Sequence, residues 1–199
     1  GILNSFAPGG LTEYTIHDSV TEIGNLAFFD CDNLTCVTIG DSVTTIGDKA
    51  FYDCDSLTSV TIGDSVTTIG ESAFRECDSL TSVTIGDSVT TIGEWAFYYC
   101  NSLTEFNGKF AEDNGRILVV DGVLTAFAPA GITEYNIPDS VTTIGERAFS
   151  YCDSLTSVNI PDSVTTIGGN AFVYCGSLKK VYCYATIPPS LGNYPFSSN

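Results

Sequence analysis

The sequence has few basic residues and little charge of any kind. Lys and Arg together number 7 against 24 acidic residues, which gives a formal net charge of −17. Nucleic acids and anionic lipid headgroups require a basic patch, so this balance argues against both as partners. Charged residues make up 16% of the chain, below the roughly 25% of ordinary soluble domains. The surface therefore has to be built largely from uncharged polar side chains, mainly Ser and Thr.

Long apolar runs are also absent. No stretch approaches the roughly 20 apolar residues that a membrane-spanning helix needs. The sequence does not start with the charged and apolar segments of a secretion signal. We therefore expect no membrane insertion, and we expect any export signal or anchor to lie outside this sequence.

Catalytic groups are scarce as well. The chain has a single histidine, His17, and no glycine-rich phosphate loop. It has no pair of acids outside the repeat pattern described below, so acid–base, nucleophilic and metal mechanisms lack the groups that they need. We predict that the protein is not an enzyme and uses no cofactor.

What the sequence has instead is a repeat of 23 residues, LTSVTIGDSVTTIGxxAFxxCxS. A unit of this size cannot bury its apolar face alone, so units must stack with their strands about 4.8 Å apart. This stacking predicts a solenoid. Every step between opening residues is 23 except one of 29, and these residues are Leu11, Leu34, Leu57, Leu80, Leu103, Ile132, Leu155 and Leu178.

Each unit predicts a strand, a turn and a second wall. Val83 and Ile85 alternate with Ser82 and Thr84, which places one pair in the core and the other on an open face. Gly-Asp or Pro-Asp then marks a turn. A second apolar stretch and an Ala-Phe pair predict a short extended piece and one helical or 3₁₀ turn. The recurring phenylalanines should form a buried aromatic spine: Phe28, Phe51, Phe74, Phe97, Phe149 and Phe172.

The repeat is interrupted between the fifth and sixth units. Asn114-Gly115 and Asp121-Gly122 each separate apolar stretches, and both dipeptides favour two-residue hairpin turns. We predict a three-stranded meander, roughly Lys109 to Ala128, that replaces the second half of the fifth repeat and protrudes from the solenoid.

The start of the chain repeats the segment that begins at Gly122. GILNSFAPGGLTEYTIHDSVTEIG matches GVLTAFAPAGITEYNIPDSVTTIG at a constant offset. We therefore interpret the start as the third strand of another meander and expect the native protein to continue upstream. At the other end, Cys183 stands where Ile belongs and Pro188-Pro189 forbid a regular continuation.

We expect one domain over residues 1–199. Neither end looks like a strongly polar cap of the kind that solenoids need, so the chain is expected to be a piece of a longer protein. The predicted parts are an orphan strand at 1–10, repeats at 11–108, the inserted meander at 109–131, repeats at 132–177 and a degenerate final repeat at 178–199.

The unit L-x-x-V-x-I-G/P-D-S-V-T-T-I-G-x-x-A-F-x-x-C resembles the leucine-rich repeats of BspA-like surface proteins over almost the whole chain. The resemblance implies a leucine-rich-repeat solenoid, a right-handed superhelix of the α/β or mostly β class. Its parallel sheet would line the concave wall, with short strands and 3₁₀ or helical turns on the convex wall. The resemblance also implies an exported array that adheres to host matrix proteins or to other microbes. The family motif assigns no binding residues.

Cysteines and aspartates recur at fixed repeat positions. Buried thiols are the main interpretation of the cysteine ladder, and disulfides between adjacent rungs are the alternative. Zinc is disfavoured because no C-x-x-C pair or second imidazole is present. Cys36, on the open strand face, is the one thiol that we expect to be reactive. The cysteine ladder is Cys31, Cys54, Cys77, Cys100, Cys152 and Cys175. The turn aspartates are Asp18, Asp41, Asp64, Asp87, Asp139 and Asp162.

The turn aspartates should offset their mutual repulsion by bonding turn amides. The alternative is that they bind bridging calcium, which takes oxygen ligands.

The open strand face is the predicted binding surface, where the monotony of small hydroxyls breaks beside the meander. We hypothesise a cell-surface or secreted module that binds a host or microbial surface protein or glycan. The alternative is a structural spacer in a larger surface protein with no ligand of its own. The predicted binding residues are Ser82, Thr84, Glu105, Asn107, Glu134, Asn136, Ser157 and Asn159.

Overall fold

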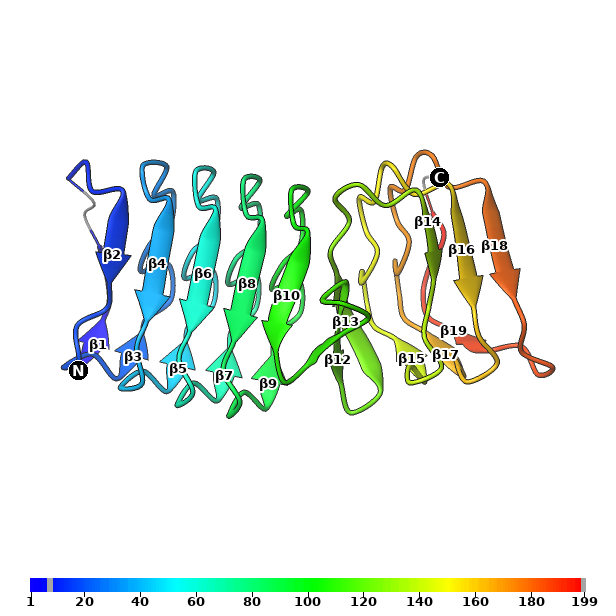
Figure 1. Ribbon diagram of the computed structural model, residues 1–199, viewed down its shortest axis with the longest axis horizontal. Helices are drawn as coiled ribbons and strands as arrows, with labels where there is room; N and C mark the ends of the chain where they lie inside the picture. The colour runs from blue at the N-terminus through cyan, green and yellow to red at the C-terminus, as the bar shows by residue number, and fades with distance from the viewer. Residues whose placement is uncertain (7–8, 198–199) are drawn as a thin grey trace. The chain divides into compact units, whose positions relative to one another are not determined.

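The computed structural model describes residues 1–6 and 9–197, and all regular elements among them are β-strands. The chain forms two compact units, Gly1–Phe110 and Ala111–Asn199 (Figure 1). The described residues include no helix of the length and apolar character needed to cross a membrane.

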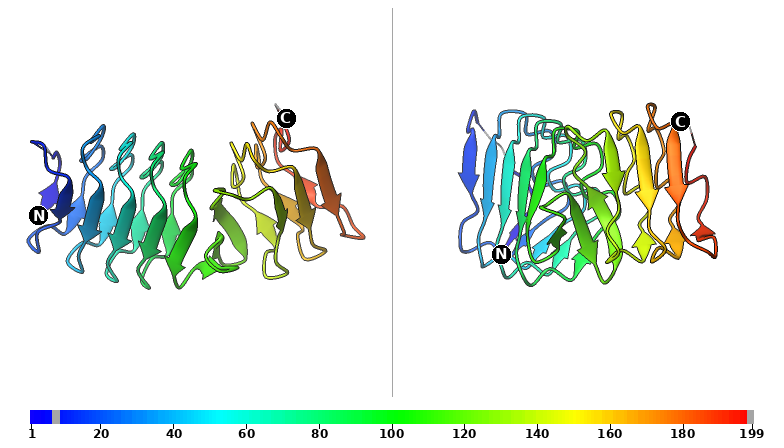
Figure 2. Two further views of the ribbon diagram at one scale, coloured as in Figure 1. Left: turned by 45° about the horizontal axis from the view of Figure 1, so that its top comes forward. Right: turned by 45° about the vertical axis from the view of Figure 1, so that its right-hand side comes forward.

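The first unit is a solenoid with two parallel sheets, which Figure 2 shows as separate walls. Residues at the same repeat position lie opposite one another, as Val37, Val60 and Val83 do. The stacking of 23-residue units is therefore confirmed. One sheet contains β2 (Glu13–Thr15), β4 (Cys36–Ile39), β6 (Ser59–Ile62), β8 (Ser82–Ile85) and β10 (Glu105–Gly108). The other contains β1 (Ile2–Leu3), β3 (Glu22–Ile23), β5 (Thr45–Ile46), β7 (Thr68–Ile69) and β9 (Thr91–Ile92).

The core of the first unit contains the predicted aromatic spine. Phe28, Phe51 and Phe74 are completely buried. Their ring centroids are 4.6 and 5.1 Å apart, and neighbouring rings are tilted by only 13° and 4°. Each such ring removes roughly 150 to 250 Å² from water, so the spine supplies a large share of the apolar burial that joins successive turns.

The segment around each Ala-Phe pair is not a helical or 3₁₀ turn, so that prediction is wrong. Lys49 and Asp53 have positive φ angles of 55° and 60°. Their N–H groups and that of Phe51 donate to carbonyls of the next turn at 2.7 to 2.9 Å, while Ala50 and Tyr52 close tight turns within their own unit. A helix would direct these amides along its own axis. Here three of the five amides bond to the next turn instead.

Threonine side chains add a second set of bonds between turns. The hydroxyl of Thr58 donates to the carbonyl of Thr35 at 2.9 Å, and Thr81 donates to Thr58 at 3.0 Å. On the other side of the solenoid, Thr67 donates to Thr44 at 3.1 Å. The threonines at these two repeat positions thus have a structural role, because their hydroxyls bond to the turn before them.

The second unit begins with the predicted three-stranded meander. Its strands β11 (Ala111–Glu112), β12 (Ile117–Val120) and β13 (Val123–Phe127) pair antiparallel. Strand β13 then pairs in parallel with β15 (Thr143–Ile144), followed by β17 (Thr166–Ile167) and β19 (Ser190–Leu191). The other parallel sheet contains β14 (Glu134–Asn136), β16 (Ser157–Ile160) and β18 (Lys180–Cys183).

The meander does not protrude, contrary to the prediction. Ile117, Leu124 and Phe127 belong to the hydrophobic core of the second unit, where Ile117 and Leu124 are completely buried. The meander is in effect the first rung of the sheet that β15 continues. Its apolar side chains lie over the end of the core because burial there stabilises them more than exposure on a separate hairpin would.

The two turns of the meander differ. Asp121 and Gly122 have φ angles of 50° and 77° and form the predicted two-residue hairpin turn between β12 and β13. Asn114-Gly115 instead lies within a four-residue loop, residues 113–116, because Glu112 pairs with Ile117. The prediction of a two-residue turn at Asn114-Gly115 is therefore wrong.

The duplicated segments adopt the same local structure. The ring centroids of Phe6 and Phe28 are 4.6 Å apart, as are those of Phe127 and Phe149. Parallel pairing of β1 with β3 corresponds to that of β13 with β15. The sequence match between the start of the chain and the segment at Gly122 is thus a structural equivalence.

Candidate binding surfaces

Four of the predicted binding residues lie together on the open strand face of the first unit. Glu105 is opposite Ser82, and Asn107 is opposite Thr84, on the paired strands β10 and β8. Ser82 is half-buried and the other three are exposed. The side chains that alternate with them, such as Val83, are completely buried. This patch therefore offers a carboxylate, an amide and two hydroxyls without contributing to the core.

The other four residues form a patch on the second unit. Glu134 is opposite Ser157, and Asn136 is opposite Asn159, on β14 and β16. The side-chain amide of Asn159 donates to the side-chain oxygen of Asn136. Lys180 of β18 lies next to Ser157. The eight predicted residues thus make two patches, one on each unit.

A second surface of the first unit was missed by sequence reasoning. We call it the turn row: Phe29, Tyr52, Arg75 and Tyr98, each of which follows the spine phenylalanine of its repeat. The rings of Phe29 and Tyr52 are stacked with centroids 5.5 Å apart. The guanidinium carbon of Arg75 lies 5.4 Å from the centroid of Tyr52 and 4.9 Å from that of Tyr98. One cation therefore lies between two tyrosine rings, in cation–π geometry.

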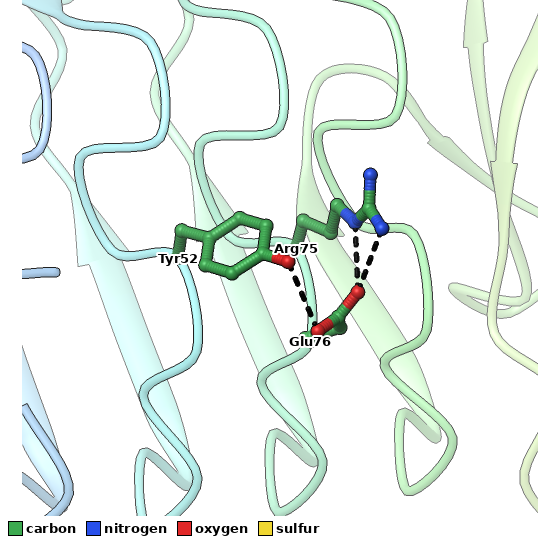
Figure 3. A network of polar contacts seen from close by, with 3 residues as sticks. All are labelled: Tyr52, Arg75 and Glu76. Atoms are coloured by element: carbon green, nitrogen blue, oxygen red, sulfur yellow. Dashed lines mark hydrogen bonds and ion pairs between the residues drawn. The ribbon is translucent and has the colours of Figure 1, made fainter. Parts of the chain in front are cut away.

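Glu76 holds the arginine of the turn row in place. Its Oε1 accepts from Arg75 Nε at 2.9 Å and from Nη2 at 2.8 Å, and its Oε2 accepts from the Tyr52 hydroxyl at 3.1 Å (Figure 3). Burial lowers the pKa of the Arg75 guanidinium, but the bonds to Glu76 and the nearby side chains of Tyr52, Glu76 and Tyr98 together raise it by more, so the pKa is raised overall. Burial and the same carboxylate raise the pKa of the Tyr52 hydroxyl.

Carboxylates lie on both sides of the first three ladder cysteines, Cys31, Cys54 and Cys77. Burial raises the pKa of Asp53, and the nearby carboxylates of Asp55, Glu76, Asp30 and Asp32 raise it further. The pKa of Asp78 is also raised, first by burial and then by its acidic neighbours. These side chains therefore repel one another. We call them the flanking carboxylates: Asp30, Asp32, Asp53, Asp55, Glu76 and Asp78.

The turn row could have been found in the sequence. Writing the repeats one above another places F, Y, R and Y in one column and D, D and E in the next. Sequence reasoning treated only the strand face as open and assigned this column to a helical turn. The bonded turns of the structure place the column at the surface instead.

The cysteine ladder consists of buried thiols with a specific partner. Cys54, Cys77 and Cys100 are free thiols. Their sulfur atoms donate to the carbonyls of Phe28, Phe51 and Phe74 in the preceding turn at 3.0 to 3.1 Å, and Cys175 likewise donates to Phe149. Cys36, the one thiol predicted to be reactive, is half-buried, whereas Cys183 is exposed.

Two of the turn aspartates, Asp41 and Asp64, bond to the next turn. Asp41 Oδ1 accepts from the N–H of Asp64 at 3.1 Å, and Asp64 Oδ1 accepts from that of Asp87 at 3.2 Å. These bonds offset part of the repulsion between stacked carboxylates. Within residues 1–6 and 9–197, no group of three His, Cys, Asp or Glu side chains is placed to hold a metal ion.

Comparison with protein families matches residues 3–114 and 124–199 to a family described as BspA type leucine-rich repeat region, in six copies. A search of curated protein sequences finds no match.

Several solved structures are similar to the chain. A leucine-rich repeat protein of T. pallidum shares 25% identity over 96% of this chain and 77% of that chain, with a TM-score of 0.59. A leucine-rich repeat protein of Bacteroides ovatus shares 26% identity over 94% of this chain and 64% of that chain, with a TM-score of 0.50. A leucine-rich cell surface protein of Faecalibacterium prausnitzii shares 26% identity over 86% of this chain and 69% of that chain, with a TM-score of 0.45.

Proposed function

Because the chain belongs to the BspA-type leucine-rich repeat family, we propose that it is a binding module of a cell-surface or secreted protein, without catalytic activity. The observation that carries this proposal is that alternate residues of the strands face the core and the solvent. In β8, Val83 and Ile85 are buried while Thr84 is exposed. Residues of the open face can therefore be chosen for recognition, since the core does not depend on them.

The proposed ligand is a protein or a glycan of a host matrix or of another microbe. The patch on β8 and β10 presents the carboxylate of Glu105, the amide of Asn107 and two hydroxyls in fixed register. The patch on β14 and β16 offers the same kinds of group from Glu134, Asn136, Ser157 and Asn159. Such groups recognise neutral polar ligands by hydrogen bonds. The affinity falls steeply when the ligand lacks one of the matching polar groups.

The test is a panel of matrix proteins and mucin glycans presented to the purified chain. Glu105→Ala with Asn107→Ala would probe the first patch, and Glu134→Ala with Asn136→Ala would probe the second. Thr38→Ala is the matched control, because Thr38 is exposed on the same face of the first unit and lies two strands away from Thr84. We expect one double variant to weaken binding at least tenfold and the control to leave it unchanged. Binding that survives both double variants would contradict the assignment of these patches.

A structural spacer is the second candidate. It is favoured by the uniformity of the first strands, since β4, β6 and β8 read CVTI, SVTI and SVTI. A recognition surface would be expected to vary more from rung to rung. Absence of binding across the panel, together with a functional domain elsewhere in the same gene product, would support the spacer.

A further inference from the structure

We propose that the first unit has a second binding surface, formed by the turn row and the flanking carboxylates, and that it binds arginine-containing segments of a partner protein. This surface is distinct from the open strand face. The proposal therefore stands or falls independently of the function proposed above.

The first argument is that the surface already holds an arginine of its own chain. Arg75 lies between the rings of Tyr52 and Tyr98, at 5.4 and 4.9 Å from their centroids. Glu76 accepts two of its hydrogen bonds, at 2.9 and 2.8 Å (Figure 3). The groups that hold this guanidinium are two tyrosine rings of the neighbouring turns and the carboxylate that follows Arg75 in the sequence.

The second argument is that an aromatic ring and carboxylates also lie together one turn earlier, at Phe29, where no cation–π contact is found within residues 1–6 and 9–197. Phe29 is followed by Asp30, and Asp53 follows Tyr52 in the next turn. Phe29 stacks on Tyr52 yet remains 46% exposed. The ion pairs found within residues 1–6 and 9–197 are Arg75–Glu76 and an Arg147–Glu146 pair. Asp30 and Asp53 therefore have no ion-pair partner in the described part of the chain.

Charge complementarity identifies the occupant. The flanking carboxylates lie in a chain with a net charge of −17, so a polyanionic ligand would be repelled and a cationic one attracted. Arginine fits better than lysine, because its planar guanidinium stacks on aromatic rings and bonds a carboxylate with two N–H groups. A bound guanidinium would also relieve the mutual repulsion of the carboxylates.

The probe is a fluorescent peptide with three arginines spaced by Gly-Ser, compared with its lysine and citrulline versions. Binding to the full chain is followed by fluorescence polarisation at two ionic strengths, about 0.05 and 0.15 M. We expect the arginine peptide to bind about fivefold more tightly than the lysine peptide. We expect the citrulline peptide not to bind. Equal affinity for the arginine and lysine peptides would reduce the effect to general charge attraction and overturn the proposal.

Two sets of variants locate the site. Asp32→Asn, Asp55→Asn and Asp78→Asn together should weaken binding of the arginine peptide about tenfold or more. The matched control makes the same change of charge at exposed aspartates of the second unit, with Asp121→Asn, Asp139→Asn and Asp162→Asn. Equal weakening in the control would overturn the proposal. Phe29→Leu, which keeps apolar bulk but removes the ring, should weaken binding without lowering the unfolding midpoint.

The sharpest test is a variant that should gain affinity. Arg75→Ala removes the resident guanidinium, so Tyr52, Tyr98 and Glu76 become available to an arginine of the peptide. Lys179→Ala is its control, since it makes the same change of net charge at an exposed site. We expect Arg75→Ala to bind the arginine peptide several-fold more tightly than Lys179→Ala does. A gain no larger than that of the control would contradict the role of the turn row.

Discussion

The thiol of Cys77 donates a hydrogen bond of 3.1 Å to the backbone carbonyl of Phe51, in the preceding turn. Both residues are completely buried. Buried backbone carbonyls need a donor, and the thiol supplies one while filling space like a small apolar side chain. This bond gives a physical reason for cysteine, rather than alanine, at this position of the repeat.

Replacing Cys77 by alanine should therefore lower the free energy of unfolding by about 1 to 3 kcal/mol, because the carbonyl loses its donor in a dry site. Cys31→Ala is the matched control. The closest acceptor of Cys31 is the carbonyl of Phe29, in its own turn and 3.9 Å away. Urea unfolding measures both variants, and equal losses would show that the bond between turns contributes little.

Gly70→Ala should be strongly destabilising. A Cβ at this position would lie 2.6 Å from the backbone N of Asp48 and from the carbonyl carbon of Gly47, in the preceding turn. The turns would have to separate, at a cost of about 1 to 3 kcal/mol or more. Gly40→Ala is the control, because nothing lies within 4 Å of its Cβ. Thermal unfolding of the two variants compares them, and similar midpoints would contradict the close approach.

Thiol labelling of the native protein should modify Cys183 and Cys36 and spare the ladder. Burial raises the pKa of Cys31 to about 11 and that of Cys100 to about 12, so little reactive thiolate forms there at neutral pH. Mass spectrometry after a short alkylation gives the pattern, and unfolding in denaturant should make all eight cysteines reactive. Native labelling of Cys100 before Cys183 would refute this assignment.

The carboxylates beside the turn row should make stability depend on pH. The pKa of Asp53 is raised above its ordinary 3.8, so the folded protein binds this proton more readily than the unfolded chain does. Its ionisation therefore costs stability above the raised pKa, and the cost disappears as the pH falls towards 3.8. Asp53→Asn should raise the unfolding midpoint at neutral pH and change it little near pH 4. Asp121→Asn is the control for the substitution itself, because Asp121 also has a positive φ angle; an equal rise in this variant would contradict the prediction.

Tyr135 should stabilise the packing of the first meander loop, residues 113–116, against β14. Its hydroxyl donates to Asp113 Oδ2 at 2.8 Å, and burial together with this carboxylate raises the pKa of the phenol. Tyr135→Phe should cost about 1 to 3 kcal/mol, since the acceptor is charged. Tyr14, its equivalent in the duplicated segment, packs on Phe28 in the same way, but no hydrogen bond of its hydroxyl is found within residues 1–6 and 9–197. Tyr14→Phe should therefore cost much less. Chemical unfolding of both variants decides, and equal losses would contradict the bond's contribution.

The sequence was sufficient for the repeat and for its stacking, because a 23-residue period with fixed apolar positions admits few arrangements. Val37, Val60 and Val83 lie opposite one another as expected. It was insufficient for the turn around Ala50 and Phe51, because an Ala-Phe pair suits a helical turn equally well. Only the amide bonds to the next turn, together with the positive φ of Lys49, decide between the two.

The candidate sites were predictable in part. Alternation in the strands identified Thr84 and Asn107 as open-face residues, and both are exposed. Sequence reasoning missed the turn row because the cation–π contacts depend on where the side chain of Arg75 lies between the two neighbouring turns. The position of the meander was predicted wrongly because the sequence does not show whether the apolar side chain of Ile117 faces solvent on a hairpin or packs in a core. Only the packing of the folded chain decides between the two.

The threonine, aspartate and cysteine ladders of the first unit share one property: the inner interfaces between rungs, such as those that join Asp41 to Asp64 and Asp64 to Asp87, use the same donors and acceptors. A duplication or loss of one 23-residue stretch would create no junction of a new kind. The number of rungs ahead of the meander is therefore free to change by recombination within the gene, while each surviving turn keeps its neighbours. The reach of the molecule can thus evolve separately from the chemistry of its surface.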